Sequence, residues 1–231
     1  MYPISSQTLD MKRILLIAFV VTTTNSVRAQ SSNCERITKF GEAELCLAKV
    51  NGYKECYLEP KVRLLADMTE VPINMVLGFY LNNSVYEKRD SLGLIRFDDY
   101  FKIYGTKEIK DYKADKSTLD EMQKVLAGNF ISKNWEEMEK EIDKIDLEVQ
   151  VGVPTVIDSY TLNNKSFTYI MLARYELEGV EPYTMAMALN GMLLNERLVW
   201  MAYYRNYTDQ SIVDQLKTNS NKILSQLMKG Y

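Results

Sequence analysis

The sequence contains no histidine. Histidine is the side chain whose ordinary pKa lies closest to neutral pH, so its absence excludes Ser-His-Asp and Cys-His catalysis, and it excludes metal sites built on histidine. No two of the ten glycines stand two residues apart, and neither the dinucleotide-binding fingerprint nor a Walker loop is present. The three cysteines form no C-x-x-C motif, and no serine is followed by lysine three positions later. The sequence therefore predicts no cofactor.

Long apolar runs are also rare, and the one near the N-terminus has the form of an export signal. Lys12 and Arg13 precede eight consecutive apolar residues at positions 14–21, far fewer than the roughly 20 that cross a bilayer. Val27 and Ala29 occupy the two positions that a signal peptidase reads. The alternative to a signal is a short buried helix.

We predict that residues 1–29 are a signal peptide, with Met11 as the true start and cleavage after Ala29. This predicts a periplasmic or secreted protein without an integral membrane span. Its removal takes away three basic and one acidic side chain, so the net charge goes from −3 to about −5, which argues against a nucleic-acid partner. No Pro/Gly/Ser-rich linker follows, so we expect a flexible segment over 30–40 and a single domain over 41–231.

Two of the three cysteines flank a turn signal. If residues 50–52 form a three-residue hairpin loop with Gly52 left-handed, the register places Cys46 opposite Cys56. That is a non-hydrogen-bonded pair, in which the alpha carbons approach most closely. In an oxidising compartment we therefore predict a disulfide between Cys46 and Cys56, with Cys34 left unpaired. The alternative is two half-buried thiols.

Hydrophobic periodicity predicts strands in the first half of the chain, followed by a pair of helices. Short or alternating apolar runs predict strands over residues 43–70, 74–81 and 100–105. The period then becomes that of amphipathic helices, the first capped by Ser117 and the second by Asn134. Their apolar stripes comprise Leu119, Met122, Leu126, Phe130, Trp135, Met138, Ile142 and Ile145.

Strand patterns return after residue 147 and give way to a long helix at the C-terminus. Asn190-Gly191 is the sharpest turn signal in the chain and predicts a two-residue hairpin turn. Residues 198–204 are apolar or aromatic throughout, which predicts a strand covered on both faces. A helical period continues to residue 228 and is interrupted at Asn219 and Ser220. The predicted fold class is α+β, an antiparallel β-sheet with packed helices.

The order of these elements resembles that of the PsbP-like fold group. The likeness is carried by the Leu189-Asn190-Gly191-Met192 hairpin, the aromatic strand after it, and the helix from Ser211-Ile212-Val213 to Leu227. The group includes PsbP, which is a photosystem extrinsic subunit, Mog-type Ran-binding proteins and periplasmic DcrB-type lipoproteins. The resemblance covers residues 40–228 and implies a shared scaffold, so no functional residue is carried over. The lipoprotein motif of the DcrB-type members is missing.

Carboxylates are the catalytic groups that remain. Glu136, Glu137, Glu139 and Glu141 stand opposite the apolar stripe of a predicted helix, so we expect solvated side chains with ordinary acidity. Asp98-Asp99 lacks the spacing of a calcium loop, and we interpret it as part of a turn. The sequence therefore predicts no catalytic and no metal-binding residue.

Aromatic residues are the remaining candidates for a binding site. Trp200, Tyr203, Tyr204 and Tyr207 gather near the end of one predicted strand. Tyrosine combines a large apolar area with a polar tip, so such a group can stack on a sugar or hold a partner protein. The alternative is an ordinary half-buried sheet.

The first functional hypothesis is an exported, non-enzymatic binding or accessory protein of the bacterial cell envelope. Its partner is expected to be an envelope protein or a small ligand. A second hypothesis is a carboxylate-dependent hydrolase such as a glycosidase, in which two acids must face each other across roughly 5 to 9.5 Å. A third is an immunity or inhibitor protein, suggested by small size, acidity and export.

Overall fold

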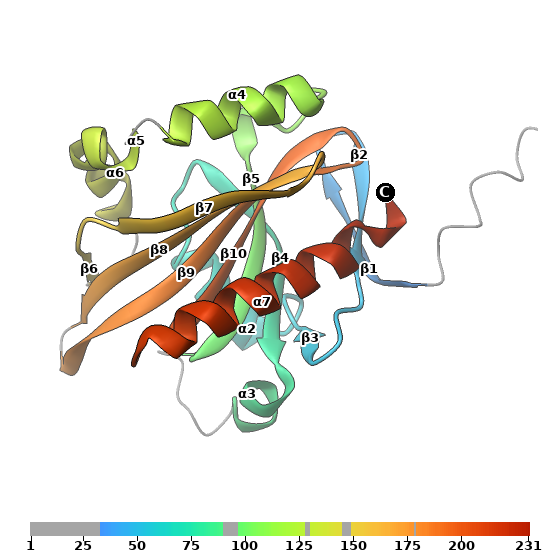
Figure 1. Cartoon of the computed structure of the whole chain (residues 1–231). Coiled ribbons are helices and arrows are strands. Elements are labelled where there is room, and N and C mark those ends of the chain that lie inside the picture. The colour runs from blue at the N-terminus through green and yellow to red at the C-terminus, as the bar shows by residue number, and fades with distance from the viewer. Residues whose placement is uncertain (1–32, 90–96, 128–129, 145–148, 178) are drawn as a thin grey trace, which may run out of the picture. The chain divides into compact units, whose positions relative to one another are not determined.

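The computed structural model describes residues 33–89, 97–127, 130–144, 149–177 and 179–231, and an antiparallel β-sheet with packed helices forms within them (Figure 1). The α+β class is therefore confirmed. The predicted signal peptide lies outside the described residues, and so does Ile145 of the predicted helical stripe. None of the helices in the described part of the chain has the length and apolar character needed to span a bilayer.

The main sheet has eight antiparallel strands in the order β3, β4, β5, β10, β9, β8 and β6, and β7 also pairs with β8. Strands β1 and β2 form a separate two-stranded sheet. The strands are β1 (Cys34–Phe40), β2 (Ala43–Ala48), β3 (Tyr53–Glu55), β4 (Asn74–Asn82), β5 (Asp99–Thr106), β6 (Val149–Val151), β7 (Thr155–Asn163), β8 (Ser166–Leu177), β9 (Val180–Leu194) and β10 (Arg197–Asn206).

Helices cover both faces of the main sheet (Figure 1). Helix α7 packs on one face, against Val199, Met201 and Tyr203 of β10. Leu198 and Trp200 alternate with these and point to the other face, where α4, α5 and α6 cover them. Helix α2 packs on β4 at that same face. The helices are α2 (Pro60–Met68), α3 (Asn83–Lys88), α4 (Lys116–Ala127), α5 (Phe130–Lys133), α6 (Trp135–Ile142) and α7 (Gln210–Leu227), with 3-10 turns at Lys107–Ile109 and Met228–Gly230.

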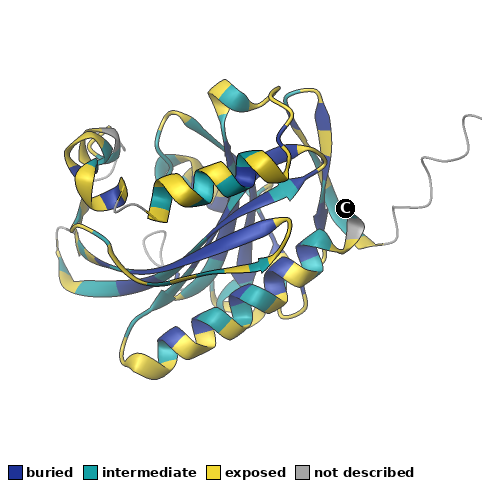
Figure 2. Cartoon of the chain, turned by 45° about the horizontal axis from the view of Figure 1, so that its top comes forward, coloured by how far each residue is buried: buried dark blue, intermediate teal, exposed yellow. Residues whose placement is uncertain are grey.

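The C-terminal helix is anchored along its whole length. It begins where Asp209 Oδ1 accepts a hydrogen bond from the backbone N–H of Ser211 at 2.8 Å. Figure 2 shows its buried stripe against the sheet and its exposed outer side. Ser220, expected to interrupt the stripe, is fully buried and donates through Oγ to Asn190 Oδ1 at 3.1 Å. A hydrogen bond therefore holds the middle of the helix where apolar contact was lacking.

The predicted turn at Asn190-Gly191 is wrong. Strand β9 passes straight through both residues, and the turn follows at Asn195 and Glu196, whose φ angles are 46° and 57°. Two consecutive residues at positive φ are typical of a type I′ hairpin turn. The β9–β10 hairpin is therefore longer than the sequence indicated, and Trp200 pairs with Gly191.

The interior explains why Asn190 and Gly191 occur together. Asn190 is fully buried, and its amide is enclosed in a hydrogen-bond network. A Cβ at position 191 would lie 2.4 Å from the ring of Phe167, so only glycine fits beneath that ring. The pair is thus explained by packing within the sheet.

Three local expectations are corrected. Residues 43–70 contain helix α2 as well as strands, and the helix starts with Pro60 at its first position, where a missing N–H costs no hydrogen bond. Asp115 caps α4 in place of Ser117, because its Oδ1 accepts from the N–H of Thr118 at 3.0 Å. Phe130 begins the short α5 and is 38 % exposed.

The predicted Cys46–Cys56 disulfide is wrong, because β2 and β3 belong to different sheets. Gly52 is left-handed as expected, with φ of 87°, but the chain that leaves the turn pairs with β4. Cys46 instead bonds to Cys34, with their alpha carbons 5.3 Å apart. Cys56 is a buried free thiol, and burial raises its pKa to about 12.

The expected flexible segment over residues 30–40 is wrong from Cys34 onward. Residues 34–40 form β1, which pairs with β2. Arg36 reaches across from β1 to form an ion pair with Glu55, with Nε 2.9 Å from Oε2. The ring of Phe40 is fully buried. A disulfide, a salt bridge and an apolar anchor therefore fix the strand.

We expect peptide mapping without reductant to recover Cys34 and Cys46 in one linked peptide pair. Cys56 should react with a maleimide only after denaturation, because it is buried and its thiolate is disfavoured near neutral pH. Recovery of a linked Cys46–Cys56 pair, or rapid labelling of Cys56 in the native protein, would contradict this arrangement.

Candidate functional site

Strand alternation separates the four aromatic residues that the sequence proposed as a binding site. Trp200 and Tyr204 lie on the sheet face that α2 and α4 cover, whereas Tyr203 lies under α7. Tyr207 follows the end of β10 and donates its backbone N–H to Thr184 O at 2.9 Å. The structure therefore does not bring the four together as one site.

Tyr203 belongs to a buried polar network beneath α7. Its ring is fully buried, and its hydroxyl lies 3.0 Å from that of Tyr53 and 3.4 Å from Asn219 Nδ2 of α7. Tyr53 also donates to Asp99 Oδ1 at 2.8 Å. Burial raises the pKa of Tyr203 to about 12 and also raises the pKa of Asp99. The network ties the helix to the sheet, so Tyr203 has a structural role.

Five half-buried tyrosines gather on the opposite face of the sheet. Strand pairing sets Tyr100 of β5 beside Tyr204 of β10 and Tyr175 of β8 beside Tyr183 of β9. The rings are parallel in both pairs, with centroids 4.8 Å and 5.7 Å apart. Tyr104 lies four residues after Tyr100 on the same face of β5. We call these five residues the tyrosine surface.

The tyrosine surface is flanked by two buried clusters on the same sheet face. One lies under α2 and includes Phe79 and Leu81 of β4. The other lies under α4–α6 and includes Tyr169 of β8 and Leu198 of β10. Helices therefore stand on two sides of the tyrosine surface.

A buried ion pair stands among the tyrosines. Lys102 Nζ lies 2.5 Å from Glu70 Oε2, and the two side chains are 9 % and 8 % exposed. The same ammonium lies 5.5 Å from the ring centroid of Tyr104 and 6.0 Å from that of Tyr204, which adds cation–π attraction. Asn74 Nδ2 donates to the second carboxylate oxygen of Glu70 at 2.9 Å. The centre of the surface thus carries two charges that cancel.

Four of the phenols on the tyrosine surface, those of Tyr100, Tyr104, Tyr175 and Tyr204, are neutral at physiological pH. Burial raises the pKa of Tyr175 to about 12, and it raises those of Tyr100, Tyr104 and Tyr204 further above the ordinary value. Within the described residues, no hydrogen bond engages these four hydroxyls. Each can therefore donate and accept a hydrogen bond with an incoming molecule.

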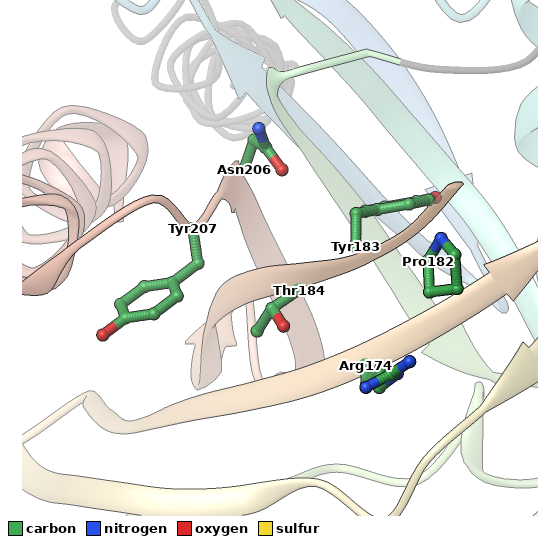
Figure 3. Close-up of a pocket in the computed structure, with 6 residues that line it drawn as sticks. All are labelled: Arg174, Pro182, Tyr183, Thr184, Asn206 and Tyr207. Carbon is green, nitrogen blue, oxygen red and sulfur yellow. The ribbon is translucent and has the colours of Figure 1, made fainter. Parts of the chain in front are cut away.

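A pocket of about 340 Å³ lies at the ends of β8, β9 and β10. Figure 3 shows Tyr207, Thr184 and Arg174 around it. Asn206, Pro182 and Tyr183 of the tyrosine surface also line it. Arg174 Nε is 3.0 Å from Glu176 Oε1 in an exposed ion pair, so its charge is already balanced. The pocket is polar and open, and of the proposed binding residues it receives Tyr207 alone.

The carboxylates that the sequence singled out are placed as follows. Glu136, Glu137 and Glu139 are exposed on α6, as predicted. Asp99 is not a turn residue, because it begins β5 and accepts from Tyr53. Among the described residues, no group of three or more acidic or cysteine side chains is arranged to hold a metal ion.

Comparison with protein-family models, with curated proteins and with solved structures finds no match to this chain. The PsbP-like resemblance stays a prediction, and the turn on which it partly rested lies five residues further along. Of the tyrosine surface, the sequence had singled out Tyr204 alone. It missed Lys102 and Glu70, whose pairing across 32 residues no local pattern signals.

Proposed function

We propose that this chain is an exported, non-catalytic binding protein that holds a small organic ligand on the tyrosine surface. The observation that carries the proposal is the presence, on one sheet face, of four tyrosines whose hydroxyls have no hydrogen-bond partner among the described residues. None of these four hydroxyls is among the described buried polar atoms that lack a partner, so each reaches the surface. A ligand that both donates and accepts hydrogen bonds can therefore bind them there.

The state of the buried carboxylates favours binding over catalysis. Glu55 is paired with Arg36, and Glu70 is paired with Lys102. Asp99 accepts hydrogen bonds from Tyr53 and from Asn82. A general acid or nucleophile needs a carboxyl group within reach of substrate, and these three are occupied by their own neighbours. The hydrolase hypothesis therefore has less support than binding.

Export is the second part of the proposal and rests on two observations. Residues 11–29 have the charge and apolar pattern of a signal peptide. The Cys34–Cys46 disulfide is of the kind that persists in oxidising compartments such as the periplasm. N-terminal sequencing of the protein from its host tests this part. A chain that starts at Gln30 is expected, and an intact Met1 would contradict export.

Binding is tested by a thermal-shift screen of a small-molecule library. We expect at least one compound to raise the melting temperature of the unmodified chain, because a ligand of the folded state stabilises it by mass action. The Tyr175→Ala and Tyr204→Ala variants should lose that shift. Tyr112→Ala is the matched control, since Tyr112 is 54 % exposed and lies outside the tyrosine surface.

The screen can also contradict the proposal. A shift that persists in both surface variants would place the ligand elsewhere, and the absence of any shift across the library would remove the small-molecule function. Turnover of a hydrolase substrate, lost on changing Glu70 or Asp99, would favour the enzymatic alternative.

A further inference from the structure

We infer that the ligand of the tyrosine surface is a neutral carbohydrate, an inference that rests on the proposed binding function. The surface offers hydroxyl-bearing ring edges around two cancelling charges. Three properties of the described residues lead to this class of ligand. They are the stacking of the rings, the lack of protein hydrogen-bond partners for four of the hydroxyls, and the pairing of the two charges.

The stacking of the rings determines which part of each tyrosine is available. Tyr100 is covered on one face by Phe79, at 5.3 Å between centroids, and on the other by Tyr204 at 4.8 Å. Both faces of the Tyr100 ring are therefore covered. A flat apolar ligand prefers an open ring face, and it would bury these hydroxyls without offering them a hydrogen bond.

The phenol hydroxyls favour a ligand that both donates and accepts hydrogen bonds. Each phenol has one donor proton and acceptor lone pairs, and those of Tyr100, Tyr104, Tyr175 and Tyr204 are free of protein partners in the part of the chain described. A sugar carries hydroxyl groups of the same dual character around a ring with apolar C–H faces. It can satisfy several phenols at once and still pack on their ring edges.

The charges favour a neutral sugar over a charged one. An anion would meet the Glu70 carboxylate, and a cation would meet the Lys102 ammonium, which already occupies the space beside the Tyr104 and Tyr204 rings. Both charged side chains are more than nine-tenths buried and are paired with each other. Among the described residues, this ion pair therefore leaves no unpaired charge at the centre of the tyrosine surface to bind an ionic group.

The test uses the fluorescence of Trp200, which pairs with Tyr104 across β5 and β10. The chain has two tryptophans, so Trp135→Phe leaves Trp200 as the sole reporter. In that background the probes are methyl glucoside, cellobiose and chitobiose as neutral sugars, glucuronate and glucosamine as charged sugars, and indole as an apolar ring. We expect saturable binding of at least one neutral sugar and at least tenfold weaker binding of the charged ones.

The decisive variants are Tyr175→Phe and Tyr204→Phe. They keep the rings and remove hydroxyls that have no protein partner in the structure, so the melting temperature should stay unchanged. Each should weaken sugar binding by roughly fivefold to tenfold, the effect of losing one hydrogen bond. Tyr112→Phe, at an exposed position away from the surface, should leave binding unchanged.

The outcomes separate the two proposals. If indole binds, if Tyr204→Ala abolishes that binding, and if no sugar binds, the binding function stands and the carbohydrate class is wrong. Glucuronate or glucosamine binding as tightly as the neutral sugars would also overturn the class, because it would show that the ion pair does not discriminate. If no probe binds, or if the phenylalanine variants bind sugar as the unmodified chain does, the carbohydrate proposal fails at this surface.

Discussion

Replacing Asn190 with alanine is expected to destabilise the fold by about 3 kcal/mol or more, because the change leaves several buried polar groups without partners. Asn190 Oδ1 accepts from Thr168 Oγ1 at 2.7 Å and from Ser220 Oγ at 3.1 Å. Its Nδ2 donates to the carbonyl oxygens of Ala188 and Met201, each at 3.0 Å. One amide thus joins β8, β9, β10 and α7. Urea denaturation followed by circular dichroism measures the loss.

Two further variants make this result specific. Asn51→Ala, in an exposed turn, should change stability by less than about 0.5 kcal/mol. In the Asn190→Ala background, Ser220→Ala should lower the free energy of unfolding by less than it does in the unmodified chain. The Ser220 hydroxyl has already lost its acceptor in that background. An Asn190→Ala protein with an unchanged urea midpoint would mean that the network contributes nothing to stability.

Replacing Arg36 with methionine is expected to lower the free energy of unfolding by about 3–5 kcal/mol, the usual effect of leaving one member of a buried ion pair unpaired. Arg36 donates through Nε and Nη2 to the two carboxylate oxygens of Glu55, at 2.9 Å and 3.0 Å, and through Nη2 to Leu77 O at 2.5 Å. The Glu55 side chain is 5 % exposed. Without the guanidinium, the donors left to the Glu55 carboxylate within the described residues are the backbone N–H groups of Tyr57 and Phe79.

The matched control is Lys113→Met. Lys113 and Glu196 form an ion pair of 3.5 Å whose side chains are 77 % and 67 % exposed, and such a pair contributes less than about 1 kcal/mol. The double variant Arg36→Met with Glu55→Met should recover much of the stability lost in Arg36→Met, because it also removes the unpaired Glu55 carboxylate. Equal losses for Arg36→Met and Lys113→Met would show that burial of the first pair has no energetic consequence.

The strands and helices were largely predictable from hydrophobic period, whereas their pairing was not. The run from Asn74 and the run from Tyr100 each became a strand, and the final helix ends as predicted, because these patterns are local. The Asn190-Gly191 turn was wrong because the same residues that suit a turn also suit a buried amide and a ring placed over a glycine. Sequence alone does not distinguish these uses.

The cysteine pairing failed for a related reason. Gly52 was placed correctly in the left-handed region, but the strands on either side of it pair with partners elsewhere in the chain, β1 and β4. Which strand pairs with which depends on the burial of the whole sheet. The alternation that separates Tyr203 from Tyr204 could have been read from the sequence, since neighbouring residues of a strand point to opposite faces.

The two faces of the main sheet differ in how much substitution they tolerate. On the α7 face, Tyr53, Asn190 and Tyr203 form hydrogen bonds with one another or with the helix. Most changes there therefore leave a buried polar group without its hydrogen-bond partner. On the opposite face, the hydroxyls of Tyr175 and Tyr204 bind nothing else in the described chain. A library of variants confined to the hydroxyl-bearing positions Tyr175 and Tyr204 should therefore yield mostly folded proteins, in contrast to changes at Asn190 or Tyr203.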